Sequence, residues 1–358
     1  MALSLLTPPR ALRYVSASLA AALDRALFSP THAFPPAVLI ELSGLAIAQI
    51  VAREYPRHTY PCVLVAAGPG NQGADGLAAA RHLRTWGWKI AVWGPRLKGD
   101  SEQLATQLSH FDVHFLDSDA QAFEDYLEHA DVVLDTLFGF SFQGPAREPY
   151  AEILRLLSSE SRIEFAFRRP RPPIVSVDIP SGWPVDASSS SASASSSSSS
   201  SAAASSDGLA PPGCFTPQVL ISLSAPKTGV RALVSQPSAA LAPPQQPAQQ
   251  PRAQHAHAQQ PLKHYLAGRF IPPALEAELG LALPLYEGTQ GWLDVTGWPE
   301  MSEEEAKALH AEAKKRQEEL EEQGVRDAEM AEMQAEQEDE EAQGADEEED
   351  AKTVKADA

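Results

Sequence analysis

Short runs of apolar residues, separated by segments of helical periodicity, limit the folds open to this 358-residue chain more than any other feature. The runs are rich in β-branched side chains, as in Val63-Leu64-Val65 and Ile174-Val175-Ser176-Val177. Strands that are apolar throughout are buried on both faces, which is typical of a parallel sheet covered by helices. The pattern predicts an α/β protein with a Rossmann-like, doubly wound, mostly parallel sheet and helices on both faces.

The hydrophobic periodicity assigns the expected elements one by one. Proline is favoured in the first turn of a helix, so Pro35-Pro36 is expected to open the first one. The other expected helices cover 74–86, 101–110, 120–129 and 147–158. The expected strands are 63–65, 90–93, 113–116, 132–134, 174–177 and 219–223.

Two low-complexity segments interrupt the predicted domain, which we place at residues 24–285. Residues 187–206 are almost all Ser and Ala, and residues 236–261 are rich in Pro, Gln and Ala. Neither can bury enough apolar surface to fold, so both are expected to be disordered insertions in surface loops, where extra length costs little stability. Residues 286–358 are expected to form an acidic tail, partly helical and largely disordered.

The charge of the chain is concentrated in that tail. Residues 301–358 hold 22 Asp and Glu against seven Lys and Arg, which is −15 of the formal net charge of −20. No basic stripe appears, so no nucleic-acid partner is expected. No run of about 18 apolar residues appears either, so no membrane partner is expected. Cys62 and Cys214 give no disulfide framework and no metal-ligand spacing, which fits a reducing compartment such as the cytoplasm.

The first 23 residues leave two interpretations open. They contain Arg10, Arg13 and several Ser and Leu, and no acidic residue precedes Asp24. This composition resembles a mitochondrial transit peptide, although Pro8 and Pro9 interrupt part of an amphipathic helix. The segment is therefore either a transit peptide, with a mitochondrial location beside the cytoplasmic one, or a flexible N-terminus.

Three chemically distinctive motifs directly follow buried strands. They are the loop Gly68 to Gly76, the segment Asp135 to Phe142, and Asp178-Ile179-Pro180-Ser181-Gly182-Trp183. The carboxyl ends of parallel strands lie along one edge of the sheet, where ligands bind. Two carboxylates and a glycine-rich loop should therefore converge on one crevice.

Each motif also has a plain structural interpretation. The loop contains GxGxxG, which suits phosphate at a helix start but also any tight strand-to-helix turn. A dinucleotide-binding dehydrogenase favours an acidic residue after the second strand, where this chain has Gly94, Pro95 and Arg96. Asp135 and Asp178 could each cap the next helix. An NAD(P)-dependent oxidoreductase is thus the weaker interpretation of the loop.

Taken together, the motifs resemble those of the NAD(P)H-hydrate epimerase family, also known as the YjeF N-terminal domain family. That family carries GPGNNGGDG, VDAIFGFSFKG, DIPSGW, LISLTAPK and YLGGRFVPP in this order. This chain has GPGNQGADG at 68–76, LDTLFGFSFQG at 134–144, DIPSGW at 178–183, LISLSAPK at 220–227 and YLAGRFIPP at 265–273. The resemblance covers about residues 20–285.

The resemblance implies an isomerase that interconverts the R and S epimers of hydrated NADH and NADPH for cofactor repair. It also implies a homodimer, one potassium ion per subunit, and a separate NAD(P)H-hydrate dehydratase that uses the product. Gln72, Asp135 and Ser181 stand where the family holds potassium, with Gln72 in place of an Asn. The residues implied in binding the hydrated dinucleotide are Asn71, Gln72, Gly73, Ala74, Asp75, Gly139, Phe140, Ser141, Phe142, Gln143, Gly144, Pro145 and Asp178. Ala74 replaces a Gly of the family, and Gln143 replaces a Lys.

Asp178 is the expected catalytic residue. The substrate carries a hydroxyl on a ring carbon bonded to nitrogen, and that carbon loses its configuration if hydroxide leaves or the ring opens. Either route needs a positioned acid or base, a role that a carboxylate suits. The competing interpretation is a non-catalytic scaffold domain of the kind found in messenger-RNA decapping proteins. Asp135, Asp178 and Ser181 together favour the enzyme.

Overall fold

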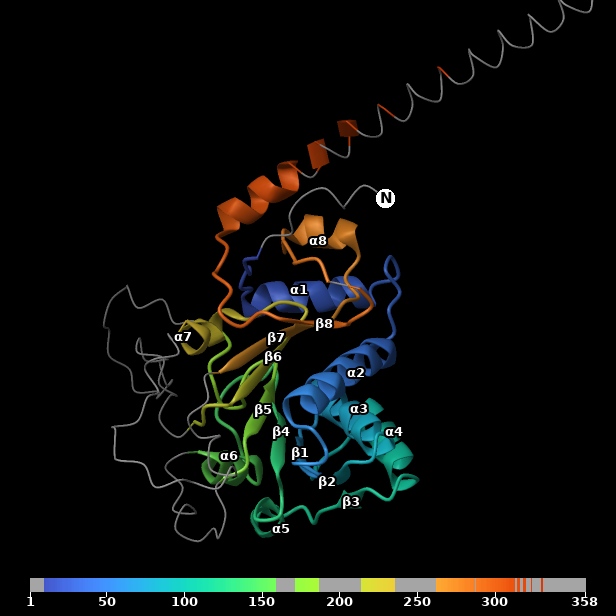
Figure 1. The fold of residues 1–358 in the computed structure, drawn as a ribbon, viewed down its shortest axis with the longest axis vertical. Coiled ribbons are helices and arrows are strands. Elements are labelled where there is room, and N and C mark those ends of the chain that lie inside the picture. Colours follow the sequence, from blue (N-terminus) through green and yellow to red (C-terminus); the bar gives the residue numbers. More distant parts are fainter. Residues whose placement is uncertain are drawn as a thin grey trace, which may run out of the picture. The chain divides into compact units, whose positions relative to one another are not determined.

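The computed structural model describes residues 10–158, 171–186, 214–235, 262–286 and 288–312, with isolated residues up to 330. Residues 9–302 form one compact unit, and residues 1–8 with 303–358 form another. In the first unit the described strands build one sheet in the order β3-β2-β1-β4-β5-β6-β7-β8 (Figure 1). Neighbouring strands are parallel from β3 through β7, and β8 is antiparallel to β7. The predicted doubly wound, mostly parallel sheet is confirmed.

The six expected strands, β1 to β6, and the five expected helices, α2 to α6, fall close to their predicted positions, whereas α1, α7, α8, β7 and β8 were not expected. The strands are β1 (Cys62–Ala67), β2 (Lys89–Trp93), β3 (His114–Phe115), β4 (Val132–Thr136), β5 (Ile174–Val177), β6 (Val219–Leu223), β7 (Lys263–Ala267) and β8 (Trp292–Asp294). The helices are α1 (Ala17–Phe28), α2 (Pro36–Glu54), α3 (Asn71–Thr85), α4 (Asp100–Ser109), α5 (Ala120–Leu127), α6 (Tyr150–Leu157), α7 (Arg231–Val234) and α8 (Pro273–Leu279). A 3₁₀ turn at Thr228–Val230 precedes α7.

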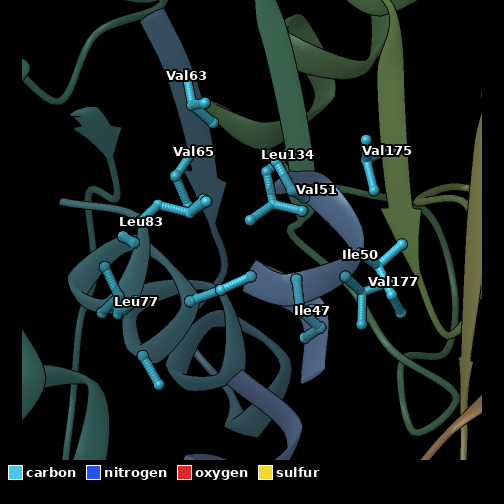
Figure 2. Packing of buried hydrophobic residues seen from close by; sticks show 14 of the residues in the cluster. Ile47, Ile50, Val51, Val63, Val65, Leu77, Leu83, Leu134, Val175 and Val177 are labelled. Atoms are coloured by element: carbon cyan, nitrogen blue, oxygen red, sulfur yellow. The ribbon is translucent and has the colours of Figure 1, made fainter. Parts of the chain in front are cut away.

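Side chains alternate between the two faces of the sheet, and each face has its own helical layer. Val63 and Val65 of β1 pack with α2, α3 and α4, whereas Leu64 packs with α5 and α6 on the other face. Figure 2 shows the first layer, in which strand valines meet the helical side chains Ile47, Ile50, Val51, Leu77 and Leu83. This two-faced burial is what the wholly apolar strands require.

Helix α2 is long and apolar enough to cross a membrane by length and composition alone. Its side chains Ile47, Ile50 and Val51 are completely buried against the sheet. In this fold α2 is therefore a core helix.

The expected boundary at residue 23 is wrong, because residues 10–23 belong to the folded unit. Ser16 caps α1 by accepting a hydrogen bond from the Leu19 backbone N–H, and Leu23 is buried. Val15 is tied by its backbone to Pro226 and Thr228. Residues 17–23 belong to an amphipathic helix. Its Ala, Leu, Ser and Arg residues are also typical of a transit peptide, so composition alone does not distinguish the two.

The expected start of the tail at residue 286 is also wrong. β8 extends the sheet, with Leu293 opposite Leu266 of β7. Val295 and Met301 are buried, and the Met301 backbone N–H donates to the Leu12 carbonyl. The folded unit therefore reaches residue 302. Residues 303–312 are helical, as the charge pattern of the tail predicted. The expected insertions at 187–206 and 236–261 lie outside the described residues.

The buried His264 makes the stability of the folded protein depend on pH. It is 1% exposed in β7, its Nε2 lies 2.9 Å from Ser222 Oγ, and burial lowers its pKa to about 4. Below pH ~6.5 the histidine binds a proton in the unfolded state, whereas in the folded state it stays neutral down to about pH 4. The free energy of unfolding therefore decreases as the pH falls from ~6.5 towards 4. We expect the wild type to lose about 2 kcal/mol from this group between pH 7 and pH 5.

Denaturant unfolding at pH 7 and pH 5 measures this loss as the difference between wild type and His264→Gln, because other groups titrate in the same range. The exposed His58→Gln variant is the control and should follow the wild type. Equal pH responses of wild type and His264→Gln would show that His264 does not set this dependence.

Candidate active site

A cavity of about 930 Å³ opens at the carboxyl ends of the central strands. The strand order reverses between β1 and β4, and in doubly wound sheets ligands bind at this switch point. The loop after β1, the segment after β4 and Asp178 after β5 all contribute to the cavity wall. α1 and α2 add an apolar wall that includes Leu23, Leu39 and Ile40.

The glycine loop carries the chain from β1 into α3 and leaves the start of that helix facing the cavity. Asn71 and Gln72, in the first turn of α3, line the cavity, and unpaired N–H groups at a helix start attract anions. A Cβ atom at Gly73 would overlap the carbonyl oxygen of Gly68, so glycine there permits the tight turn. This arrangement suits the phosphate of a nucleotide.

The structure brings most of the expected dinucleotide-binding residues to the cavity. Asn71, Gln72, Asp75, Asp178 and every residue from Gly139 to Pro145 line it. Gly73 and Ala74 do not. Ala74 is 1% exposed and packs in the hydrophobic core, and Gly73 packs against the loop backbone. Gly73 and Ala74 therefore support the first turn of α3 without lining the cavity.

Asp135 lies behind the cavity wall, fully buried and surrounded by hydrogen-bond donors. Its carboxylate accepts from Ser181 Oγ at 2.6 Å, from the Ser181 N–H at 2.9 Å and from Ser176 Oγ at 2.9 Å. Burial raises the pKa of Asp135, and the hydrogen bonds from Ser181, Ser176 and Leu137 work in the opposite direction. Ser181 Oγ in turn accepts from the Phe138 N–H, which ties the second and third motifs together.

Asp178 has the features expected of a functional carboxylate. It is 2% exposed, lines the cavity, and has a positive φ of 65°, which is uncommon for a residue other than glycine. Its backbone N–H donates to the Ile221 carbonyl at 2.6 Å. One carboxylate oxygen, Oδ1, forms an ion pair with Lys227 Nζ. Neither carboxylate oxygen has a hydrogen-bond partner among the described residues, and Oδ2 has no ion pair there either. Oδ2 is therefore the oxygen free to exchange a proton with a bound molecule.

Two further carboxylates face the same space. Asp75 comes from α3 and Asp24 from α1, and both line the cavity. Burial raises the pKa of Asp75 well above its usual value, and the charges of Asp178 and Asp24 add to the effect. Burial also raises the pKa of Asp24, with Lys227 opposing and Asp178 reinforcing the shift. The cavity thus combines an ion-paired carboxylate with two carboxyl groups whose pKa values are raised by burial.

Sequence reasoning missed Asp24 and Lys227 as site residues. Lys227 could have been found, because it follows the strand 219–223 and lies at the same sheet edge as the three motifs. Asp24 gives a weaker signal, as the acidic residue beside the buried Leu23 and Leu27 of an amphipathic helix. Arg96 follows β2 and Arg147 follows the second motif; both line the cavity, and neither was singled out as a site residue from the sequence.

Fold and site together define an α/β protein of the nucleotide-binding type, with a carboxylate centre at the switch point of its sheet. The model of the family described as YjeF-related protein N-terminus matches residues 36–229. The chain belongs to this family, as its motifs predicted.

Curated relatives and a solved structure agree with this membership. The NAD(P)H-hydrate epimerase of Mycosarcoma maydis is 41% identical, over 83% of this chain and 94% of the relative. The NAD(P)H-hydrate epimerase of Cryptococcus neoformans is 36% identical, over 77% and 95%. The crystal structure of yeast ynu0 matches with a TM-score of 0.59 and 32% identity, over 79% of this chain and all of the yeast chain.

Proposed function

We propose that this protein is an NAD(P)H-hydrate epimerase, which interconverts the R and S epimers of hydrated NADH and NADPH. The observation that carries the proposal is the buried Asp178, which lines a cavity large enough for much of a dinucleotide, at the switch point of the sheet. The relatives that match along nearly their whole length bear this same name. The biological role is cofactor repair.

The chemistry requires a proton to move at the hydroxyl group of the hydrated ring. Asp178 Oδ2 accepts the hydroxyl proton as the bond between that carbon and the ring nitrogen breaks. The nitrogen keeps the bonding electron pair, which is delocalised towards the conjugated carboxamide, so the products are an aldehyde and a ring-opened enamine anion. Rotation of the aldehyde and re-closure of the ring return the proton and give the other epimer. In the second route to the other epimer, a carboxyl group protonates the hydroxyl group so that it leaves as water. Water then adds back to the opposite face of the ring and returns the proton. Both routes use a carboxyl group at the position of Asp178.

The remainder of the substrate has matching partners around the cavity. The backbone of Asn71 and Gln72 at the start of α3 is suited to phosphate, and Arg96 and Arg147 add positive charge. Phe140 and Phe142 offer aromatic surface, and Ser141 to Pro145 form an exposed rim. We infer that the charged part of the dinucleotide binds at the polar end and that its ring lies near Asp178.

The residues expected to hold potassium fit a monovalent cation by their chemistry. Asp135, Ser181 and Gln72 offer a carboxylate, a hydroxyl and an amide oxygen, the hard ligands that such cations take. Asp135 is completely buried, and no ion pair to it is found among the described residues. The side chain of Gln72 donates through Nε2 to the Val177 carbonyl. Its Oε1 packs so close to Gly139 that a Cβ atom there would lie only 2.7 Å away, so a glycine leaves room for this amide. A cation bound there would offset the charge of Asp135 and orient the segment that carries Ser181.

Gln72→Asn should strengthen the response of turnover to potassium. The family has Asn at this position, and the extra methylene of Gln moves its carbonyl oxygen by about an ångström, a displacement that matters for a ligand site. We expect the potassium concentration for half-maximal activation to fall by about tenfold, equivalent to about 1.4 kcal/mol. Titration with potassium chloride, against choline chloride at equal ionic strength, measures this. No response to potassium in either variant would remove the ion from the proposal.

Assembly and location complete the proposal. We infer a homodimer that passes its product to a separate NAD(P)H-hydrate dehydratase, in the cytoplasm or in the mitochondrion. Size-exclusion chromatography with light scattering tests the first point, and microscopy of the tagged full chain tests the last.

A turnover assay separates this function from the alternatives. The slowly used epimer is supplied to a stereospecific dehydratase, and regenerated NADH is followed by absorbance with and without this protein. An epimerase accelerates the reaction, whereas a scaffold domain of the decapping type leaves it unchanged. An NAD(P)-dependent oxidoreductase would instead change absorbance with an oxidisable substrate and no dehydratase.

A further inference from the structure

Lys227 is the charged residue of the LISLSAPK motif, and it lines the cavity together with Leu223, Ser224 and Ala225 of the same motif. Its side chain is 4% exposed, although a lysine is almost never fully buried without a partner. The ammonium group donates to the carbonyl oxygens of Leu223 at 2.9 Å and Ala225 at 3.1 Å, and it forms the ion pair with Asp178 Oδ1. The ammonium group thus has two backbone hydrogen bonds and one ion pair, all with protein atoms.

The backbone on both sides of the ion pair is arranged to bring these two groups together. Asp178 follows β5 with φ of 65°, and Ser224 follows the neighbouring strand β6 with φ of 64°. The Asp178 N–H donates to Ile221, and the Ser224 N–H donates to Ala267 at 2.7 Å. Uncommon conformations at the ends of adjacent strands cost energy, and the surrounding structure retains them where they serve a site.

The other charges around Asp178 would work against its ionised form. Asp24 from α1 and Asp75 from α3 both face it, and Arg96 and Arg147 line the cavity without an ion pair to it among the described residues. Like charges disfavour a carboxylate and an opposite charge favours it. Lys227 is thus the described positive group in direct contact with Asp178.

We propose that Lys227 is a positioning residue for Asp178: its ammonium group offsets the charge of the buried carboxylate and holds the side chain at the cavity wall. The proposal rests on the epimerase function above. The contacts of the Lys227 ammonium group are the carbonyl oxygens of Leu223 and Ala225 and the Asp178 carboxylate, so we expect it to act through Asp178. Its ring contact with Phe140, 5.3 Å from Nζ to the ring centroid, further fixes the side chain.

Lys227→Met tests this by the pH dependence of turnover. Without the ammonium, the ionised form of Asp178 needs a higher pH, so the acidic limb of kcat/KM should move upward by about one to three pH units. We expect kcat to fall at least about tenfold at pH 7 while KM changes little. Lys227→Arg should keep the limb near its wild-type position. Lys263→Met, in β7 and outside the cavity lining, is the matched control.

A second measurement does not depend on turnover. Thermal unfolding of Asp178→Asn, Lys227→Met and the double variant reports on the pair itself, because removal of one partner leaves a buried charge uncompensated. We expect the double variant to melt at a higher temperature than Lys227→Met alone. If Lys227→Met does not fold, Lys227→Gln in the same two experiments takes its place, since its amide still donates to the backbone carbonyls.

The outcomes separate the possible failures. A lower melting temperature with an unmoved acidic limb would make Lys227 a merely structural residue and overturn the proposal. If the changes in melting temperature of the two single variants add up to that of the double variant, Lys227 and Asp178 are not coupled, and this result would also overturn the proposal. A wild type without turnover would instead reject the epimerase function, while the unfolding cycle would still report whether Lys227 and Asp178 are coupled.

Discussion

Asp178→Asn is expected to lower kcat by about two to four orders of magnitude, the usual contribution of a group that transfers a proton. Asn keeps the size of the side chain and an oxygen that can accept from Lys227, but it cannot take the proton of the hydroxyl group. Substrate binding should weaken far less than turnover, because the cavity wall is otherwise unchanged. Steady-state kinetics on the slowly used epimer measure both effects.

The same variant should also be less stable, by about 1–3 kcal/mol, because the buried Lys227 loses its charged partner. Kinetics are therefore measured well below the melting temperature of the variant. Asp117→Asn is the control, since Asp117 is an exposed carboxylate that follows β3 outside the cavity lining. Near-normal turnover in a destabilised Asp178→Asn would show that Asp178 only supports the turn after β5.

Two truncations should behave in opposite ways. A chain that ends at Gly291 lacks β8, so β7 loses its pairing across Tyr265 to Ala267. It also loses the buried side chains Trp292, Val295 and Met301. At about 1.5–3 kcal/mol for each large buried side chain, the loss is on the order of 5 kcal/mol or more, comparable with the whole stability of a domain. We expect this chain to be insoluble or to unfold without cooperativity.

A chain that ends at Ser302 keeps β8 and the contacts of Leu12 with Pro299 and Met301. It loses residues 303–358, which lie outside the unit formed by residues 9–302, so the melting temperature should stay within a few degrees of the full chain. Turnover should be retained. Calorimetry on both truncations makes the comparison, and cooperative unfolding of the shorter one would mean that β8 is dispensable.

The sequence predicted the centre of the sheet well and its margins poorly. β1, β2, β4, β5 and β6 are mostly apolar and almost wholly buried, because both faces of a central parallel strand are covered. β7 begins with Lys263 and His264 and has three further residues, and β8 has only three residues, so both give a weak local signal. Their pairing depends on strands that lie far away in sequence, which local patterns do not reveal.

The candidate site was predicted where it depends on strand ends and missed where it depends on long-range packing. Asp178 and the glycine loop follow strands, so the topology of a parallel sheet places them at one edge. The ion pair of Lys227 with Asp178 depends on the backbone conformations of Asp178 and Ser224, which periodicity does not report. Asp24 reaches the cavity only because α1 packs beside the segment after β6.

The position of residues 236–261 in the chain bears on how this protein could be labelled. The described residues end at Ser235, directly after α7, and begin again at Leu262, directly before the amino end of β7. Asp178, Lys227 and the loop before α3 all lie at the carboxyl ends of the strands, the opposite edge. A fluorophore, affinity tag or reporter domain attached within 236–261 would therefore start from the edge remote from the chemistry, and could report on the enzyme inside a cell while both chain ends stay native.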